Sequence, residues 1–132
     1  MNPMRLLVID DDPDLVSSVT TVMENDGWEV HSAPNGVEGL EKARQLLPEL
    51  IILDILMPRK DGLTTYEELR GDESLRAIPI IVLSSAGEKL GFGFSASDMA
   101  AHYGHQPEAF LQKPFEPQLL IQTARRVARP RG

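Results

Sequence analysis

The feature that most constrains the fold of this chain is a regular alternation between short apolar runs and amphipathic segments. Three of the runs, Leu6–Ile9, Leu50–Leu53 and Ile80–Leu83, are apolar throughout and contain β-branched residues. A strand has this composition when helices cover both of its faces. Two further candidate strands, Trp28–Ser32 and Ala109–Gln112, complete a set of five.

The segments between these strands carry the signals of helices. Asp12 followed by Pro13 predicts a helix start, and Gly27 predicts where that helix ends. Pro48 ends the second helix, and the last begins near Pro117. We expect four helices, each with one apolar face. In chain order these faces comprise Leu15, Val16, Val19, Val22 and Met23; Val37, Leu40, Ala43 and Leu47; Leu63, Tyr66 and Leu69; and Leu120, Ala124 and Val127.

This alternation predicts an α/β fold, because parallel strands need helical crossovers between them. We expect an open, doubly wound, five-stranded parallel sheet with helices on both faces. A chain of 132 residues suits one domain, which we place at 1–132 with a core at about 4–129. The segment 86–108 is less regular than the rest, and within it only Ser97–Tyr103 has a helical pattern.

Charge and composition exclude several classes of protein. The chain has 13 Lys and Arg against 20 Asp and Glu, which disfavours a broad nucleic-acid-binding face. It has no cysteine, so disulfides and thiol chemistry are excluded. No apolar run exceeds four residues, whereas a membrane-spanning helix needs about 20. We therefore expect a cytoplasmic protein that does not enter a membrane.

The basic residues gather at one end of the chain. Four arginines, Arg125, Arg126, Arg129 and Arg131, lie within a basic tail at 125–132. Cations complement the dipole at the C-terminus of a helix, which is the interpretation we favour. A linker toward a further domain is the alternative.

Polar side chains follow the expected strands at the points where those strands end. Asp10 and Asp11 follow the first strand, Asp54 the third, Ser84 the fourth and Lys113 the fifth. Ligands of doubly wound sheets bind at the carboxyl ends of the strands. The sequence therefore predicts three carboxylates, a hydroxyl and an ammonium at one edge of the sheet.

These residue types favour phosphoryl chemistry assisted by a divalent metal. Carboxylate oxygens, without histidine or cysteine nearby in the sequence, suit Mg²⁺. A lysine beside them suits a tetrahedral anion, and a carboxylate can serve as the nucleophile that forms an aspartyl-phosphate. Asp54 lies in an apolar context and needs a partner for its charge, whereas Asp12 is best explained as a helix cap.

Four segments resemble the receiver domain of two-component response regulators. They are Leu6–Asp12, Leu53–Pro58 together with Asp61–Gly62, Pro79–Ser85, and Phe110–Phe115. The four occur in the order and on the elements that the family has, over most of the chain. The resemblance implies a flavodoxin-like sheet with strand order 2-1-3-4-5.

The resemblance also implies a role for each candidate residue. Asp54 matches the acceptor of a phosphoryl group from a sensor histidine kinase or a phosphotransfer protein. Asp10 and Asp11, with Asp54 and the backbone carbonyl of Leu56, match the residues that hold Mg²⁺.

Three further residues match the parts of the family that respond to phosphorylation. Lys113 matches the lysine that pairs with the phosphorylated carboxylate. Ser84 matches the hydroxyl that turns toward the phosphoryl group, and Phe110 matches the aromatic switch. Simple core packing is an equally good interpretation of Phe110. The implied output is contact with a downstream protein, without direct nucleic-acid binding by this domain.

Two other functions remain open at this point. A haloacid dehalogenase-like, Mg²⁺-dependent phosphatase would use Asp10 and Asp12 as its Asp-x-Asp pair, but the Asp54–Pro58 and Asp61–Gly62 motifs would then have no role. A receiver-like interaction module that is never phosphorylated is the third hypothesis. One departure from the family pattern stands out: Lys113 lies 29 positions after Ser84, farther than the family usually has.

Overall fold

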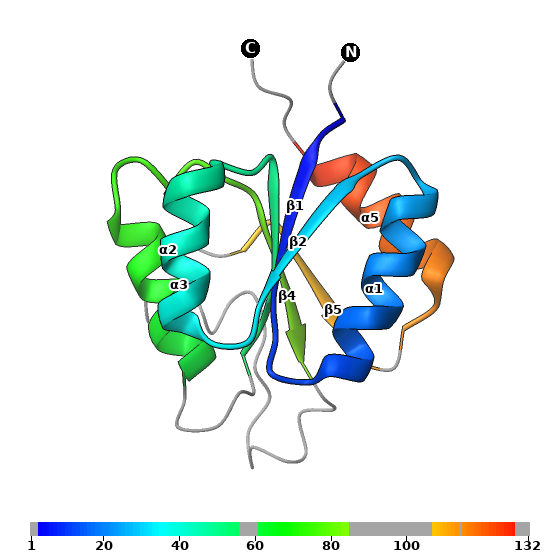
Figure 1. Cartoon of the computed structure of the whole chain (residues 1–132), viewed down its shortest axis with the longest axis horizontal. Coiled ribbons are helices and arrows are strands. Elements are labelled where there is room, and N and C mark those ends of the chain that lie inside the picture. Colours follow the sequence, from blue (N-terminus) through cyan, green and yellow to red (C-terminus); the bar gives the residue numbers. More distant parts are fainter. Residues whose placement is uncertain (1–2, 56–60, 85–106, 114, 129–132) are drawn as a thin grey trace.

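A computed structural model gives the structure of the chain and describes residues 3–55, 61–84, 107–113 and 115–128. Strands and helices alternate along these ranges (Figure 1), and each expected strand lies within one residue of its observed bounds. The elements are β1 (Arg5–Ile9), α1 (Pro13–Asn25), β2 (Glu29–Ala33), α2 (Gly36–Leu46), β3 (Leu50–Asp54), α3 (Asp61–Gly71), β4 (Ile80–Ser84), β5 (Ala109–Gln112) and α5 (Pro117–Val127).

The five strands form one parallel sheet in the order β2-β1-β3-β4-β5. This confirms the predicted doubly wound fold and its strand order. Figure 1 shows α2 and α3 on one face of the sheet and α1 and α5 on the other. The helical pattern expected at Ser97–Tyr103 lies outside the described residues. Within the part of the chain that is described, no helix is long and apolar enough to cross a membrane.

Alternate side chains of each central strand enter two separate cores. Leu7 and Ile9 of β1 pack in the cluster under α2 and α3, whereas Leu6 and Val8 pack in the cluster under α1 and α5. Every residue of β3 is buried. Continuous apolar runs are required because each of these strands has a helix layer on both sides.

The boundaries of α1 follow the predicted cap and stop signals. Asp12 is the N-cap, and its Oδ1 accepts hydrogen bonds from the backbone N–H groups of Asp14 (3.0 Å) and Leu15 (3.4 Å). Pro13 is the first helical residue. After the helix, Gly27 has a φ of 93°, in the left-handed region that favours glycine.

The predicted apolar face of α2 was wrong at both ends. Val37 is 74% exposed, and Leu47 is 41% exposed with a φ of 46°, just beyond the helix. The buried face of α2 instead includes Gly36 and Gly39 beside Leu40 and Ala43. Gly39 lies so close to the Ile9 side chain that an added Cβ would be 2.6 Å from Cδ1 of Ile9. A pattern search that follows large apolar residues overlooks such a contact.

The described part of the basic tail belongs to a helix end. Arg125 and Arg126 lie in the last turn of α5, as the dipole interpretation expects. Arg125 forms a two-pronged ion pair with Asp26 at the end of α1, and its Nε is 3.1 Å from Oδ2 of Asp26. Hydrogen bonding to Arg125 holds the pKa of Asp26 below its usual value. Arg129 and Arg131 lie outside the described residues.

Candidate functional site

The sheet brings Asp10, Asp54 and Lys113 together from three strands. Ile9 of β1 pairs with Leu53 of β3, so the next residues, Asp10 and Asp54, are neighbours at the carboxyl edge. Lys113 follows β5 and places its Nζ 3.1 Å from Oδ2 of Asp54 and 3.5 Å from Oδ2 of Asp10. The predicted partner for the charge of Asp54 is therefore Lys113.

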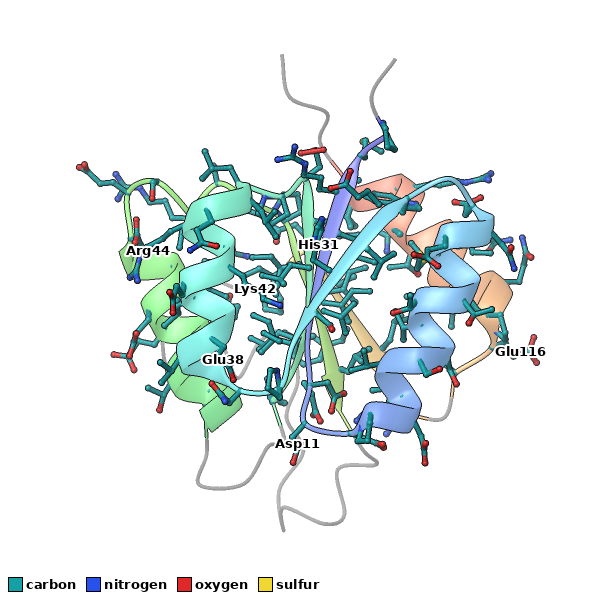
Figure 2. All side chains as sticks on the ribbon, in the orientation of Figure 1. Asp11, His31, Glu38, Lys42, Arg44 and Glu116 are labelled. Carbon is teal, nitrogen blue, oxygen red and sulfur yellow. The ribbon has the colours of Figure 1, made fainter. Side chains whose placement is uncertain are left out.

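Asp11 lies on the open side of this group. One carboxylate oxygen from each of Asp10, Asp11 and Asp54 lies within 4.8 Å of the others. The side chains of Asp10 and Asp54 are 0% and 5% exposed, whereas Asp11 is exposed and points away from the end of the sheet (Figure 2). Three converging carboxylate oxygens, of which one belongs to an exposed residue, fit a small divalent cation that retains several waters, as Mg²⁺ does.

Burial and neighbouring charges shift the acid–base properties of this group. Burial raises the pKa of Asp10 to about 6, helped by the nearby charge of Asp54. The hydrogen bond that the Asp12 backbone N–H donates to Asp10 Oδ1 (2.9 Å) and the Lys113 charge act in the opposite direction. For Lys113, burial disfavours the ammonium, but Asp54 and Asp10 outweigh it, so the pKa of Lys113 lies above its usual value. The site thus holds more negative charge than one lysine balances.

The burial of Asp10, together with the nearby charge of Asp54, predicts that the Asp10 carboxylate lowers stability at neutral pH when Mg²⁺ is absent. The pKa of Asp10 is 3.8 in an ordinary setting and about 6 here, so the folded chain holds this proton more tightly than the unfolded chain. The associated stability is present below pH 4 and is lost as the pH rises through 6. We expect Asp10→Asn, which keeps the acceptor for Asp12, to be more stable than the wild type by about 1–2 kcal/mol at pH 7.5.

Urea unfolding in EDTA, followed by fluorescence of the single tryptophan, Trp28, measures this difference. Trp28 is buried and distant in sequence from the substitution. The advantage of Asp10→Asn should shrink as the pH falls from 7.5 to 4. An advantage that does not change with pH would contradict a titrating Asp10.

The remaining predicted site residues are described to different extents. Ser84 is the last residue of β4 and pairs with Gln112, so its backbone lies at the same edge; its side chain lies outside the described part. Leu56 also lies outside the described residues. Phe110 is partly buried, pairs with Val82 in the sheet and packs on the core under α2 and α3.

Gly62 is a neighbour of the site to which sequence reasoning gave no separate role. It is the second residue of α3, and its Cα lies against the backbone of Asp54 and Ile55. The sequence indicated this contact only through the Asp61–Gly62 pair shortly after β3. Such a pair is also common where a helix begins.

Asp12 does not contribute to the group of carboxylates, contrary to what a haloacid dehalogenase-like phosphatase would need. Its side chain is exposed and caps α1, whereas Asp10, Asp11 and Asp54 are the three described carboxylates that converge. The converging carboxylates therefore follow two different strands, Asp10 and Asp11 after β1 and Asp54 at the end of β3.

Comparison with known proteins identifies the class that this fold and site define. The model of the response regulator receiver domain family matches residues 6–125. The chain therefore belongs to the response regulator receiver domain family, the signalling domains of two-component systems. Domains of this family are phosphorylated on an aspartate, bind Mg²⁺, and act between histidine kinases and downstream effectors.

Individual relatives include both long and short proteins. The chain is 33% identical over 125 residues to the DNA-binding dual master transcriptional regulator RpaA of Synechocystis sp., covering 95% of this chain and 49% of RpaA. It is 29% identical over 119 residues to PilH of Pseudomonas aeruginosa, covering 90% of this chain and 93% of PilH. The chain thus spans about half the length of RpaA and nearly all of PilH.

Solved structures agree with the fold. A putative response regulator from Chloroflexus aurantiacus superimposes with a TM-score of 0.79 at 31% identity, covering 94% of this chain and 96% of that one. The chemotaxis protein CheY4 of Vibrio cholerae gives a TM-score of 0.78 at 27% identity, covering 95% of this chain and 98% of that one. The predicted flavodoxin-like architecture is confirmed.

Proposed function

We propose that this chain is a phosphorylatable switch in which Asp54 accepts a phosphoryl group from a sensor histidine kinase or a phosphotransfer protein. The observation that carries the proposal is the buried Asp54 carboxylate, 3.1 Å from Lys113 Nζ and beside Asp10. The phosphatase alternative finds no comparable support, because the family match is to receiver domains and Asp12 caps a helix.

Asp10, Asp11 and Asp54, together with the backbone carbonyl of Leu56, would hold Mg²⁺. The convergence of three carboxylate oxygens supports this assignment, because it concentrates more negative charge than Lys113 alone balances. When bound, Mg²⁺ neutralises negative charge on the carboxylates and on the phosphoryl oxygens.

The residues of this chain account for the transfer step. An oxygen of Asp54 forms a bond to phosphorus while the bond from phosphorus to the donor breaks, and its electron pair leaves with the donor atom. The Lys113 ammonium already contacts Oδ2 of Asp54, so it is placed to stabilise charge on the transferred group. The near absence of exposure at Asp54 limits competition from water.

Phosphorylation would then alter the surface that a downstream protein binds. The modification replaces the single negative charge of the Asp54 carboxylate with a phosphoryl group of charge about −2 beside β4, and the Ser84 hydroxyl would turn to donate a hydrogen bond to it. Phe110, on the adjacent strand, would follow as the aromatic switch. A partner that prefers one arrangement shifts the population between the two. We assign residues 1–132 to one receiver domain acting in the cytoplasm on a protein partner.

The test is incubation of the wild type with acetyl phosphate and Mg²⁺, followed by intact-mass measurement. We expect one phosphoryl group per chain, stable in acid and labile in base, and absent when EDTA replaces Mg²⁺. Asp14→Asn is a control for the loss of an acidic side chain that lies outside the site. Asp14 is an exposed acid in the first turn of α1, so we expect this variant to be labelled like the wild type. No adduct on the wild type would favour an interaction module that is never phosphorylated, and multiple turnovers of a phosphate ester would favour the phosphatase.

A further inference from the structure

The first turn of α3 lies directly against the backbone that carries the Asp54 carboxylate. Gly62 is buried in that turn. A Cβ at position 62 would collide with the carbonyl oxygen of Asp54 and with Cα of Ile55, and would lie 2.8 Å from the carbonyl carbon of Ile55. Glycine has no Cβ, so it is the residue that allows such a close approach. The space available therefore requires glycine here.

Three other glycines within the described residues differ from Gly62 in what surrounds them. Gly27 has a left-handed φ with nothing within 4 Å, so backbone conformation explains it. Gly39 faces the Ile9 side chain, which has rotatable bonds. Gly71, in the last turn of the same helix as Gly62, also has nothing within 4 Å of an added Cβ. At Gly62, in contrast, the obstacle is the main chain on each side of the Asp54–Ile55 peptide bond.

Neither partner in this contact can move without breaking other interactions. Asp54 is paired with Leu83 in the sheet, and the Ile55 N–H donates to the Leu83 carbonyl (3.2 Å). On the other side, α3 is anchored by Tyr66 and Leu69, both 0% exposed. A side chain at position 62 must therefore displace either the end of β3 or a packed helix.

Displacement of the end of β3 would misalign the site, because its other members come from different elements. Lys113 follows β5 and Asp10 follows β1, so neither would move together with Asp54. We propose that Gly62 is a positioning residue: the absence of a side chain at 62 sets where the Asp54 carboxylate lies relative to Asp10 and Lys113. The expected effect of Gly62 on phosphoryl transfer rests on the proposed function.

The test compares Gly62→Ala with Gly71→Ala, the same substitution at the open end of the same helix. Three properties are measured under conditions where circular dichroism shows the chains folded: Mg²⁺ affinity by calorimetry, labelling by acetyl phosphate, and amide chemical shifts in metal-free protein. Leu75→Ala is a second control, because it removes buried volume from the core under α3 in the segment that leads into the start of β4, whereas Asp54 lies at the carboxyl end of β3.

For Gly62→Ala we expect Mg²⁺ to bind about 10-fold more weakly, and the labelling rate at saturating Mg²⁺ and acetyl phosphate to fall by about 100-fold. The amide signals of Asp54, Ile55 and Lys113 should shift. Gly71→Ala and Leu75→Ala should leave Mg²⁺ affinity and the saturated rate within about twofold of the wild type, even though Leu75→Ala is less stable.

Two results would overturn the inference. One is a folded Gly62→Ala chain with wild-type Mg²⁺ affinity and rate. The other is a Gly62→Ala chain that stays unfolded even in trimethylamine oxide, which favours folded states, because glycine would then serve the fold as a whole. The Mg²⁺ and chemical-shift measurements do not need phosphorylation. If the wild type is not labelled but Gly62→Ala still binds Mg²⁺ more weakly, the proposed function fails and the positioning role stands.

Discussion

Asp54→Asn is expected to abolish labelling by acetyl phosphate. Asparagine has nearly the same shape and keeps an oxygen that accepts a hydrogen bond from Lys113, but its neutral amide is a poor nucleophile. Loss of the acceptor atom should reduce labelling to below about 1% of the wild type, as loss of the nucleophile does in enzymes. Intact-mass measurement at several times of incubation with Mg²⁺ checks this.

Lys113→Met separates the loss of the acceptor from the loss of charge stabilisation. This variant keeps Asp54, so label should still form, but its rate should fall by about 10²–10³-fold because the charge that stabilises the transferred group is gone. Borohydride reduction followed by peptide mapping should place that residual label on Asp54. Label on Asp10 or Asp11 in the Asp54→Asn chain would contradict the assignment of Asp54 as the acceptor.

The convergence of the charged residues could be predicted from the sequence because it depends on topology alone. Parallel strands end at a common edge, so Asp10, Asp54 and Lys113 had to meet once the five strands were recognised. The Asp12–Pro13 helix start was equally local, since a cap acts on the next three residues.

What the sequence could not provide was contact between segments at atomic scale. The collision that a side chain at Gly62 would cause depends on how closely α3 approaches β3, which no local pattern encodes. The buried face of α2 likewise depends on a contact between segments, because Gly39 packs on Ile9 while Val37 of the same helix is exposed. The pKa of Asp10 depends on depth of burial, which apolar neighbours in the sequence indicate only in direction.

A partly buried ion pair near the amino ends of β4 and β5 was also absent from the sequence reasoning. Arg70, in the last turn of α3, has a side chain only 6% exposed and pairs with Glu108 at 2.7 Å. Its guanidinium also donates to the carbonyls of Arg76 (3.0 Å) and Ile78 (3.2 Å) and lies 5.3 Å from the centre of the Tyr66 ring. Arg70 therefore ties α3 to the segments that lead into β4 and β5.

Glu108 adds a second link from the same carboxylate. Its Oε1 accepts from the Ile80 N–H (2.7 Å) as well as from Arg70, and its own N–H donates to the Ile80 carbonyl (3.0 Å). Among the described strands, β5 has four residues, lies at the end of the sheet order and pairs with β4, so these bonds extend a short ladder by one residue. Nothing in the spacing of Arg70 and Glu108, 38 positions apart, predicts their contact.

Arg70→Met should therefore destabilise the chain by about 3–5 kcal/mol, because it leaves a partly buried carboxylate and two carbonyls without their cationic donor. Urea unfolding followed by Trp28 fluorescence measures the loss. Glu108→Gln in the Arg70→Met background should recover part of this loss, since a neutral amide needs no counter-ion and still accepts from the Ile80 N–H.

The control is Arg76→Met, which removes an exposed ion pair with Glu73 and should change stability little. A loss for Arg70→Met no larger than that for Arg76→Met would show that the pair of Arg70 and Glu108 contributes nothing to the fold. Weaker Mg²⁺ binding by folded Arg70→Met would show that the pair acts on the site as well.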